Sequence, residues 1–391
     1  MPSAVSVYEH AQISTNHRCL KGVFISGQFL SLWTSQSEVT PNSFKFRMAQ
    51  EPKALTPEQV DFFLENGYAV IKQAFTKEQA AEWTKTMWIR LGLNPNDKST
   101  WDRERIHMPW HHRETVASFA PKAWEAIKDL LGGEERIDEK SSSWGDSFIV
   151  NLGTPELEQE GSDVVPQDLG NWHVDGDFLV HFLDSPEQAL LVIPLYSDIK
   201  PRGGGTFIAT DGIDYIANYL AAHPEGVLPI SLSFVPSNST TADPKNDPGY
   251  WSHLEAAKKC NNFVELTGEI GDVILMHPLM LHSASKNHLR IPRVITNPPV
   301  SLREPFNFNR ENPEEFSIVE RKTLQALGVD KLDFKSTTER RNVLPKRVEL
   351  QNKMLEDEKK RLADLAAQVQ TTATATMSLQ RAPPVRHIIA V

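Results

Sequence analysis

The chain has 391 residues, of which 40% are hydrophobic and 24% charged, and its formal net charge is −10. This composition is that of a globular protein with a sizeable core, and the acidic balance argues against nucleic acid as the main ligand. No apolar run approaches the roughly 18 residues that span a bilayer, so neither nucleic acid nor a membrane is an expected partner. The length suits one enlarged domain with extensions.

The first 50 residues carry no clear hydrophobic pattern. No basic stretch leads into an apolar run and a cleavage site, so no secretory signal is predicted. Few acids occur in residues 1–47, which keeps an organellar transit peptide open, and Met48 is a possible alternative start. We predict a disordered extension and a cytoplasmic protein. Cys19 and Cys260 are expected to be reduced thiols, because neither has the spacing of a metal site or of a disulfide framework.

The first ordered element is predicted at "TPEQVDFFLENG". Thr56 suits the N-cap of a helix, Pro57 the first helical position, and Gln59 completes a capping box. The same arrangement returns at Thr76 in "TKEQAAEWTKTMWIRLG", which predicts a second helix after the strand-like "YAVIKQAF". A further helix is predicted over residues 121–131.

Between residues 147 and 300 the pattern changes to about eight short apolar runs divided by turn residues, which is typical of strands. Only one helix, at 211–222, is expected to interrupt them, so a sheet sandwich or barrel is favoured over a βαβ fold. The predicted fold class is mainly β with flanking helices. The runs are "SFIVNL", "WHVDGDFLVHF", "ALLVIPLY", "GTFIAT", "ISLSFV", "FVEL", "DVILMHPLMLH" and "RVITNPPV".

The C-terminal region is predicted to form one long helix, in which apolar residues recur every seven positions from Val348 to Val369. The intervening positions Gln351 and Glu358 are polar, so a helix packed along the domain is favoured over a coiled coil. The predicted organisation is an extension at 1–50, one domain at 51–345, a helix at 346–370 and a disordered tail at 371–391.

The run "NWHVDGDFLVHF" contains a candidate pair of metal ligands. Residues two apart in a strand share a face, so His173 and Asp175 converge on one point. An imidazole with a carboxylate suits a divalent metal of intermediate softness. Asp177 and His181 have the same parity and are expected to be neighbours of the site rather than ligands.

A third ligand is expected from "GDVILMHPLMLHSASKN". His277 and His282 lie five residues apart, hence on opposite faces if the strand is regular, and only one of them can point at the interior. Arg293 opens the next strand and can lie beside His282, where a guanidinium is suited to clamp a carboxylate. Arg290 falls in the intervening turn and is the weaker candidate.

Two histidines, a carboxylate and a nearby arginine suggest the facial triad of a non-haem Fe(II) site, whose open positions accept a 2-oxo acid and dioxygen. Asn151 and Ser147 share a face of the preceding strand and are candidates for contact with the cosubstrate. A loop with several aromatic and imidazole side chains is a candidate for the mouth of the site; its members are His107, Trp110, His111 and His112.

Three stretches, "LTPEQVDFFLENGYAVI", "WHVDGD" and "GDVILMHPLMLHSASKN…R", resemble the phytanoyl-CoA dioxygenase family of Fe(II)/2-oxoglutarate oxygenases. The resemblance implies that His173, Asp175 and His282 bind iron. It also implies that Arg293 binds the C5 carboxylate of 2-oxoglutarate. The implied fold is a double-stranded β-helix, a cupin-like jelly roll with flanking helices, which agrees with the predicted strands.

The sequence departs from the family pattern after the distal histidine, where Ser283, Ala284 and Ser285 stand. Ser283 is the candidate for the hydroxyl that assists 2-oxoglutarate binding. The run "PRGGGTFIAT" also differs, so substrate contacts cannot be transferred to it. The metal carboxylate is present, unlike in halogenating relatives, so hydroxylation or a related oxidation is the expected outcome.

The predicted function is an Fe(II)- and 2-oxoglutarate-dependent dioxygenase that uses O2 to oxidise an unactivated C–H bond of a small organic substrate and releases succinate and CO2. Two alternatives remain: a metal-dependent hydrolase or lyase with zinc on the same scaffold, and a non-catalytic jelly-roll binding protein. A monomer is the default expectation, and the sequence does not identify the substrate.

Overall fold

The computed structural model describes residues 52–345 and 347–380, with side chains of the last helix described to residue 370. They belong to one unit of the chain, Phe46–Val391. The predicted extension at 1–50, with Cys19 and Met48, lies outside the described residues, as do residues 381–391 of the predicted tail.

The first helices begin at the predicted capping boxes. The Thr56 hydroxyl accepts a hydrogen bond from the Gln59 backbone, and the Gln59 side chain accepts one from the Thr56 backbone. Helix α1 ends at Gly67, whose φ of 74° is the left-handed conformation that glycine adopts without strain. The second predicted helix is interrupted after Thr84 and forms two helices. The helices are α1 (Pro57–Asn66), α2 (Lys77–Thr84), α3 (Met87–Leu91), α4 (Val116–Phe119), α5 (Pro121–Leu131), α6 (Pro155–Gln159), α7 (Gly212–Ala222), α8 (His253–Ala257), α9 (Ile318–Leu327) and α10 (Arg347–Gln380).

The strands are short and pair only with antiparallel partners in the described part of the chain. Their sheets have the orders β1-β12-β6-β15, β14-β5-β2, β11-β7-β13, β10-β9-β8 and β3-β4. The strands are β1 (Tyr68–Ile71), β2 (Arg105–His107), β3 (Arg113–Thr115), β4 (Ser143–Gly145), β5 (Ile149–Asn151), β6 (Leu190–Pro194), β7 (Thr206–Ala209), β8 (Val227–Ile230), β9 (Ser233–Pro236), β10 (Trp251–Ser252), β11 (Phe263–Leu266), β12 (Val273–Met276), β13 (Leu281–Ala284), β14 (Arg293–Ile295) and β15 (Pro299–Val300).

Single-residue bridges connect these small sheets to one another and to the metal-ligand segment. Leu195, just after β6, bridges to Ile295 of β14, so the first two sheets are neighbours. His173 bridges to His282 of β13, which adds one residue to the edge of the third sheet. The prediction of a sheet-rich fold with flanking helices is therefore confirmed, and the finer jelly-roll assignment stays a prediction.

Two local predictions were wrong. The run "WHVDGDFLVHF" forms isolated bridges and turns instead of a regular strand. Gly176 has a φ of 113°, and a Cβ there would lie 2.6 Å from the His181 ring, so the chain turns where the pattern predicted extension. The run "DVILMHPLMLH" forms two strands, β12 and β13, which belong to different sheets.

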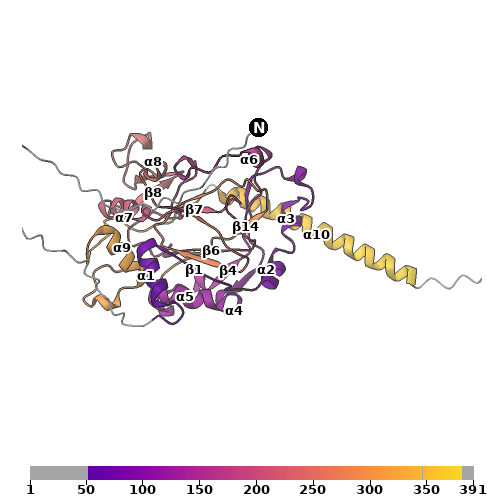
Figure 1. Cartoon of the computed structure of the whole chain (residues 1–391), viewed down its shortest axis with the longest axis horizontal. Helices are drawn as coiled ribbons and strands as arrows, with labels where there is room; N and C mark the ends of the chain where they lie inside the picture. The colour runs from indigo at the N-terminus through magenta and orange to yellow at the C-terminus, as the bar shows by residue number, and fades with distance from the viewer. Residues whose placement is uncertain (1–51, 346, 381–391) are drawn as a thin grey trace, which may run out of the picture. The chain divides into compact units, whose positions relative to one another are not determined.

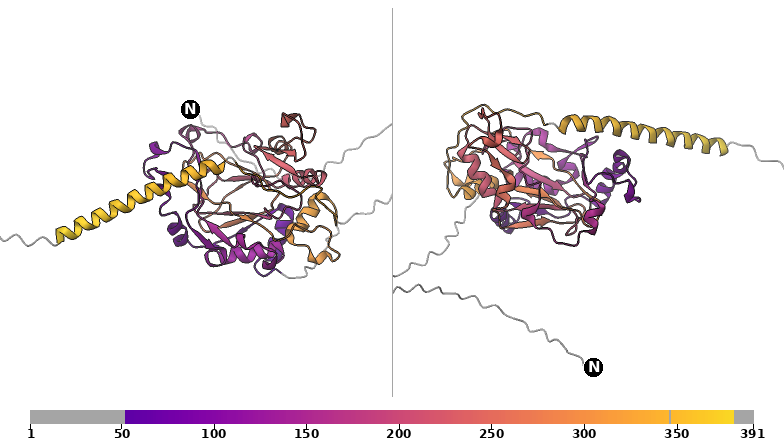
Figure 2. Two further views of the ribbon diagram at one scale, coloured as in Figure 1. Left: turned by 180° about the vertical axis from the view of Figure 1, so that it is seen from behind. Right: turned by 90° about the horizontal axis from the view of Figure 1, so that it is seen from above.

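Helices cover the sheets on several sides, as Figure 1 shows for α5, which packs against β1. The first turns of α10 dock on α3 through charged side chains. Glu358 is buried and accepts a hydrogen bond of 2.9 Å from Arg90, which also pairs with buried Asp146 at 2.7 Å. Later turns of α10 extend away from these neighbours (Figure 2), and residues 363–370 are exposed.

None of the helices in residues 52–345 and 347–380 combines the length and the apolarity that crossing a bilayer requires.

Candidate metal and cosubstrate site

Two of the predicted ligands face each other across a backbone bridge. The His173 amide donates to the His282 carbonyl at 2.9 Å, and the His282 amide donates to the His173 carbonyl at 3.0 Å. Residues that exchange both hydrogen bonds project their side chains to the same side of a sheet. Their rings accordingly lie with centroids 4.3 Å apart. The backbone therefore brings together two histidines that are far apart in the sequence.

The carboxylate of Asp175 completes a cluster of three donors. Its Oδ1 lies 3.5 Å from the His173 Nε2 and 3.6 Å from the His282 Nε2. The ligand atoms of the three side chains all lie within 4.8 Å of one another. Three ligands on one face of an ion, each about 2.1 Å from it, would lie about 3 Å apart. The cluster therefore needs only a small contraction to bind one metal ion.

Backbone carbonyls hold both imidazoles in the tautomer that a metal requires. The His173 Nδ1 lies 2.8 Å from the Asn171 carbonyl, and the His282 Nδ1 lies 2.9 Å from the Met280 carbonyl. A carbonyl only accepts, so each Nδ1 carries a proton, and each Nε2, which faces Asp175, is the atom that can give a lone pair to a metal ion. This anchoring of the distal nitrogen is typical of metal-binding histidines.

The cluster has the charge pattern of a cation site. Burial alone would raise the pKa of Asp175, but His282 and His173 outweigh it and hold that pKa well below its ordinary value. Burial opposes a charge on His173, yet its contact with Asp175 leaves the pKa of His173 raised. The carboxylate is thus ionised at neutral pH and available to a cation.

Asp175 has a further partner, Asn297, which the sequence analysis did not identify. The Asn297 amide donates to Asp175 Oδ2 at 3.3 Å, on the oxygen that does not face the histidines. Asn297 lies four residues after Arg293, so the two side chains have the same parity in an extended segment. This parity was the only sequence signal that could have identified Asn297, and its contact with Asp175 is visible only in the structure.

Arg293 lies on β14, is 2% exposed, and has no carboxylate partner among the described residues. Its Nε donates to the Gly204 carbonyl at 2.8 Å and its Nη1 to the Ile149 carbonyl at 3.3 Å. Burial lowers the pKa of Arg293 to about 10, so the guanidinium is still charged at neutral pH. A buried charge without a counter-ion is costly, which indicates that an anion binds there.

The other predicted cosubstrate contacts are placed less directly. Asn151 is opposite Arg293 in the register of β5 and β14 and is fully buried. Its amide donates to the Ser285 carbonyl, and its oxygen accepts from the Gly153 amide. Ser283 follows His282 in β13, hence faces the opposite side, and its hydroxyl donates to the Ala284 carbonyl. The structure brings neither side chain to the triad, and their roles stay predictions.

Ser285 offers a hydroxyl that is buried and without a hydrogen-bond partner among the described residues. It stands two residues after Ser283, in the short series of serines that the sequence contains at this point. Ser285 has the same parity as Ser283, so the unpartnered hydroxyl does not by itself assign it a contact with the cosubstrate.

The rival residues are engaged elsewhere. His277 is fully buried, its Nε2 pairs with the Thr323 hydroxyl at 2.9 Å, and its Nδ1 accepts from the Leu279 amide. Arg290 is also buried, and its guanidinium contacts the Lys98 carbonyl at 3.2 Å and the Glu158 carboxylate at 3.4 Å.

Asp177 and His181 are also outside the triad. Both oxygens of Asp177 accept hydrogen bonds from Arg347, at 2.6 and 2.7 Å. The His181 Nε2 lies 2.8 Å from the Gly176 carbonyl, and burial lowers the pKa of His181 to about 4. The ring is therefore neutral and holds the turn that follows Asp175.

The predicted mouth residues divide into two groups. His111 pairs with Glu358 of α10 at 2.8 Å, and the ring of His112 packs edge-on against Trp83. His107 is solvent-accessible. Burial by nearby atoms lowers its pKa, Arg293 adds to this lowering, and Asp175 acts in the opposite sense. Among these loop residues, His107 is thus the one whose pKa is affected by both Arg293 and Asp175.

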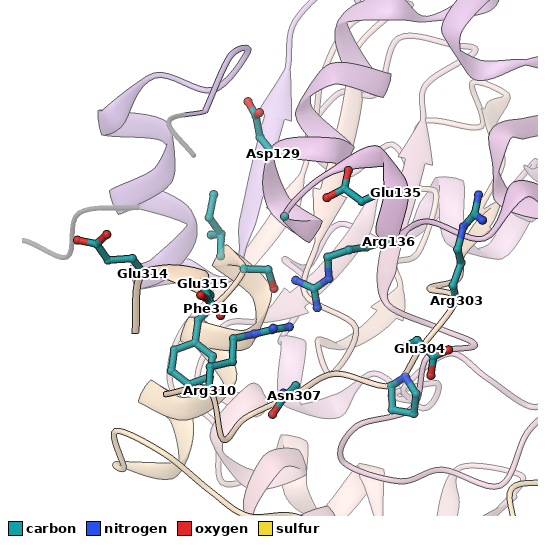
Figure 3. Close-up of a pocket in the computed structure, with 14 residues that line it drawn as sticks. Asp129, Glu135, Arg136, Arg303, Glu304, Asn307, Arg310, Glu314, Glu315 and Phe316 are labelled. Carbon is teal, nitrogen blue, oxygen red and sulfur yellow. The ribbon is translucent and has the colours of Figure 1, made fainter. Parts of the chain in front are cut away.

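A cavity of about 710 Å³ lies away from the triad, beside α5 and α9. Figure 3 shows Arg136 and Arg310 pointing into the same space at its wall. Both guanidinium groups bind the fully buried carboxylate of Glu320, at 2.7 and 3.1 Å. Glu320 already pairs with both guanidinium groups, so this cavity contains no unpaired buried charge comparable to that of Arg293.

No family model and no curated protein matches the sequence, so the resemblance to the phytanoyl-CoA dioxygenase family stays a prediction. Solved structures give distant similarities. HygX from Streptomyces hygroscopicus, with nickel and 2-oxoglutarate bound, is 14% identical, with 63% of this chain and 87% of that chain covered and a TM-score of 0.34. EctD from S. alaskensis, in its apoform, is 15% identical, with 68% and 85% covered and a TM-score of 0.34.

The epimerase SnoN, in complex with Fe3+, alpha-ketoglutarate and nogalamycin RO, is 14% identical, with 62% of this chain and 82% of that chain covered and a TM-score of 0.30. These similarities are too distant to assign a role to any residue of this chain. The function proposed below therefore depends on the side chains of the site.

Proposed function

We propose that the chain is an Fe(II)- and 2-oxoglutarate-dependent dioxygenase that oxidises an unactivated C–H bond of a small organic substrate. The observation that carries the proposal is the pairing of a three-donor cluster with a buried arginine that has no carboxylate partner in the described chain. Two imidazoles and one carboxylate suit ferrous iron, and the arginine suits the distal carboxylate of a 2-oxo diacid.

The residues present fit such a metal. His173 and His282 would each bind through Nε2, because carbonyls already occupy their Nδ1 protons. Asp175 would bind through Oδ1, while Asn297 holds its other oxygen. Three protein ligands leave coordination positions open, which is what an oxygenase needs and what a purely structural metal site does not show.

Arg293 would anchor the cosubstrate. Two of its nitrogens are held by the Gly204 and Ile149 carbonyls, which fixes the plane of the guanidinium. The remaining N–H groups have no hydrogen-bond partner among residues 52–345 and 347–370, and they suit the paired hydrogen bonds that a carboxylate accepts. When bound, iron and 2-oxoglutarate supply the activation of O2, and 2-oxoglutarate leaves as succinate and CO2.

The contribution of the chain is to position these groups and to restrict water. The bridge between His173 and His282 fixes the spacing of two ligands, and the two carbonyl contacts fix their orientation. We further propose that the small sheets form a double-stranded β-helix, since the Leu195–Ile295 bridge joins two of them and the His173–His282 bridge extends the edge of a third. HygX and SnoN, which bind 2-oxoglutarate or alpha-ketoglutarate with a metal, are compatible with this proposal.

The test is spectroscopic and does not need the substrate. Purified apo-protein is mixed anaerobically with Fe(II) and 2-oxoglutarate, and the visible band of the iron–2-oxoglutarate complex is recorded. Slow succinate formation is then measured in air with ascorbate. The wild-type protein is expected to show both signals.

Arg293→Gln should still bind Fe(II) but should require about 100-fold more 2-oxoglutarate, the loss expected for a buried charge-assisted pair. Arg290→Gln is the matched control, because that buried arginine already has a carboxylate partner, Glu158, at 3.4 Å. A protein that binds zinc instead of iron, forms no visible band and makes no succinate would contradict the proposal and favour the hydrolase or lyase alternative.

A further inference from the structure

Strand β2 adds two polar side chains to the wall on which Arg293 lies. It is the edge strand of the sheet β14-β5-β2. Residues opposite one another in such a ladder project to one face. The rows of the register are Arg105–Asn151–Arg293 and His107–Ile149–Ile295. Arg105 and His107 therefore face the same side of the sheet as the proposed cosubstrate anchor.

The opposite face of β2 confirms this orientation. Ile106 is 3% exposed and belongs to the hydrophobic core, together with Val150 and Val294, its partners across the sheet. Alternation then directs Arg105 and His107 to the face opposite Ile106, Val150 and Val294. The Arg105 side chain remains 35% exposed, so it lies where the wall opens to solvent.

Electrostatic effects agree with the placement that the strand register gives to both side chains. Burial lowers the pKa of Arg293, and the positive charge of Arg105 lowers it further. After burial, the charges of Arg293, Arg105 and Arg347 lower the pKa of His107, and Asp175 opposes them. His107 is consequently neutral at pH 7 and offers one N–H donor.

The charges of the site leave Arg105 unbalanced. On the proposed function, Fe(II), Asp175, Arg293 and the 2-oxoglutarate dianion together carry no net charge. Arg347 is neutralised by its bidentate pair with Asp177. Arg105 contacts only Glu104 among the acids of the described chain, at 3.5 Å, and both side chains are about a third exposed. Such an exposed pair is weak and easily replaced.

We infer that the substrate carries an anionic group, a carboxylate or a phosphate, that binds Arg105 and His107 and so directs the rest of the molecule toward the iron. This inference depends on the proposed function and adds the substrate class to it. Arg105 supplies a guanidinium fork and His107 a neutral donor, a pair that an oxyanion can bridge.

The experiment uses full-length protein loaded with Fe(II) and 2-oxoglutarate. The probes are matched pairs: aliphatic and aryl carboxylic acids with their primary amides, and phosphate monoesters with their parent alcohols. Binding is measured anaerobically as a perturbation of the visible band, and turnover as succinate above the substrate-free rate. The variants are Arg105→Gln and, as the matched control, Arg103→Gln. Arg103 lies before β2 and pairs with Asp102 at 3.1 Å on the surface.

Anionic members of the pairs should bind about tenfold or more tightly than their neutral partners, and Arg105→Gln should remove most of this preference. Arg103→Gln should keep it. The KM for 2-oxoglutarate in substrate-free turnover should change by less than about threefold in Arg105→Gln, since Arg293 is intact. The two arms of the panel distinguish a carboxylate from a phosphate.

Three results would overturn the inference while leaving the proposed function standing. The first is that neutral members of the pairs bind as tightly as the anions. The second is that 2-oxoglutarate forms the visible band but no anion perturbs it. The third is that Arg105→Gln raises the KM for 2-oxoglutarate. The last result would make Arg105 a second cosubstrate anchor. Absence of the band in the wild-type protein is a different result, which contradicts the proposed function itself.

Discussion

Two clusters of charged side chains in this molecule differ in whether the protein itself supplies a partner for each charge. Beside the 710 Å³ cavity, Glu320 is contacted by Arg136 and Arg310 and by two backbone amides, so every charge has a partner within the protein. In the candidate metal and cosubstrate site, Arg293 has no carboxylate partner in the described chain, and the ligand atoms of His173, Asp175 and His282 lie around a shared space.

The difference shows that cavity size is a poor guide to function here. A cluster that satisfies its own charges stabilises the fold and needs no ligand, whereas a cluster with exposed lone pairs and an unpaired buried cation gains free energy when a ligand arrives. The two clusters should therefore respond differently to substitution: one through stability, the other through binding and activity.

The largest expected effect concerns His282, a proposed metal ligand. His282→Ala removes one of three donors, and turnover of 2-oxoglutarate should fall by at least about 1,000-fold, with Fe(II) binding lost in the same variant. His277→Gln is the matched control from the same stretch of chain, and it should keep the metal because His277 serves the contact with Thr323. Calorimetric titration with Fe(II) measures both. Equal metal loss in the two variants would contradict the assignment.

Glu320→Gln should act on stability alone. Removing the charge from the fully buried Glu320 leaves the partly buried Arg136 and Arg310 without this counter-ion, and the free energy of unfolding should fall by about 3 kcal/mol. Urea unfolding measures this loss, with Glu315→Gln at the exposed rim of the same cavity as the control. Below the unfolding transition, the iron–2-oxoglutarate band should be unchanged. A weakened band at full folding would mean that the two clusters are coupled.

Buried histidines should make the fold sensitive to acid. Burial lowers the pKa of His277 and of His253 to about 3 and that of His181 to about 4. An unfolded chain binds these protons near pH 6.5 and the folded chain does not, so stability is present above that pH and is lost as the pH falls below it. Each group contributes up to about 1.4 kcal/mol per pH unit.

His277→Gln isolates one of these contributions, since Gln cannot take up the proton. Between pH 6 and pH 4, the free energy of unfolding of this variant should fall less steeply with decreasing pH than that of the wild-type protein. The two slopes should differ by the contribution of about one proton bound on unfolding. Urea titrations of the apo-protein at several pH values measure the slope. An unchanged slope would show that His277 is already charged in the folded state.

The smallest expected effect is that of Asn297. Asn297→Ala removes the hydrogen bond to Asp175 Oδ2, and the affinity for Fe(II) should fall about tenfold, as is common for residues that orient a metal ligand. Dependence on 2-oxoglutarate should be unaffected, because Arg293 is not touched. A metal affinity equal to that of the wild-type protein would show that the carboxylate orients without this amide.

Local features were predictable wherever a few neighbouring residues decide the outcome. The capping boxes at Thr56 and Thr76 formed as predicted, because a hydroxyl and a glutamine three residues apart satisfy each other's backbone groups. The regular strand predicted at His173 did not form, because Gly176 allows a turn that the hydrophobic pattern alone cannot reveal. The pattern at His277 failed for a related reason, since two sheets share one apolar run.

The sequence by itself determined the candidate donors of the site. His173, Asp175, His282 and Arg293 carry a recognisable chemistry, and their spacing was sufficient to nominate them. Tertiary structure alone decided that His173 and His282 share a backbone bridge, that Asn297 holds Asp175, and that an edge strand turns Arg105 toward the site. The physical reason is that ligand chemistry belongs to single side chains, whereas convergence depends on hydrogen bonds between segments that are far apart in the sequence.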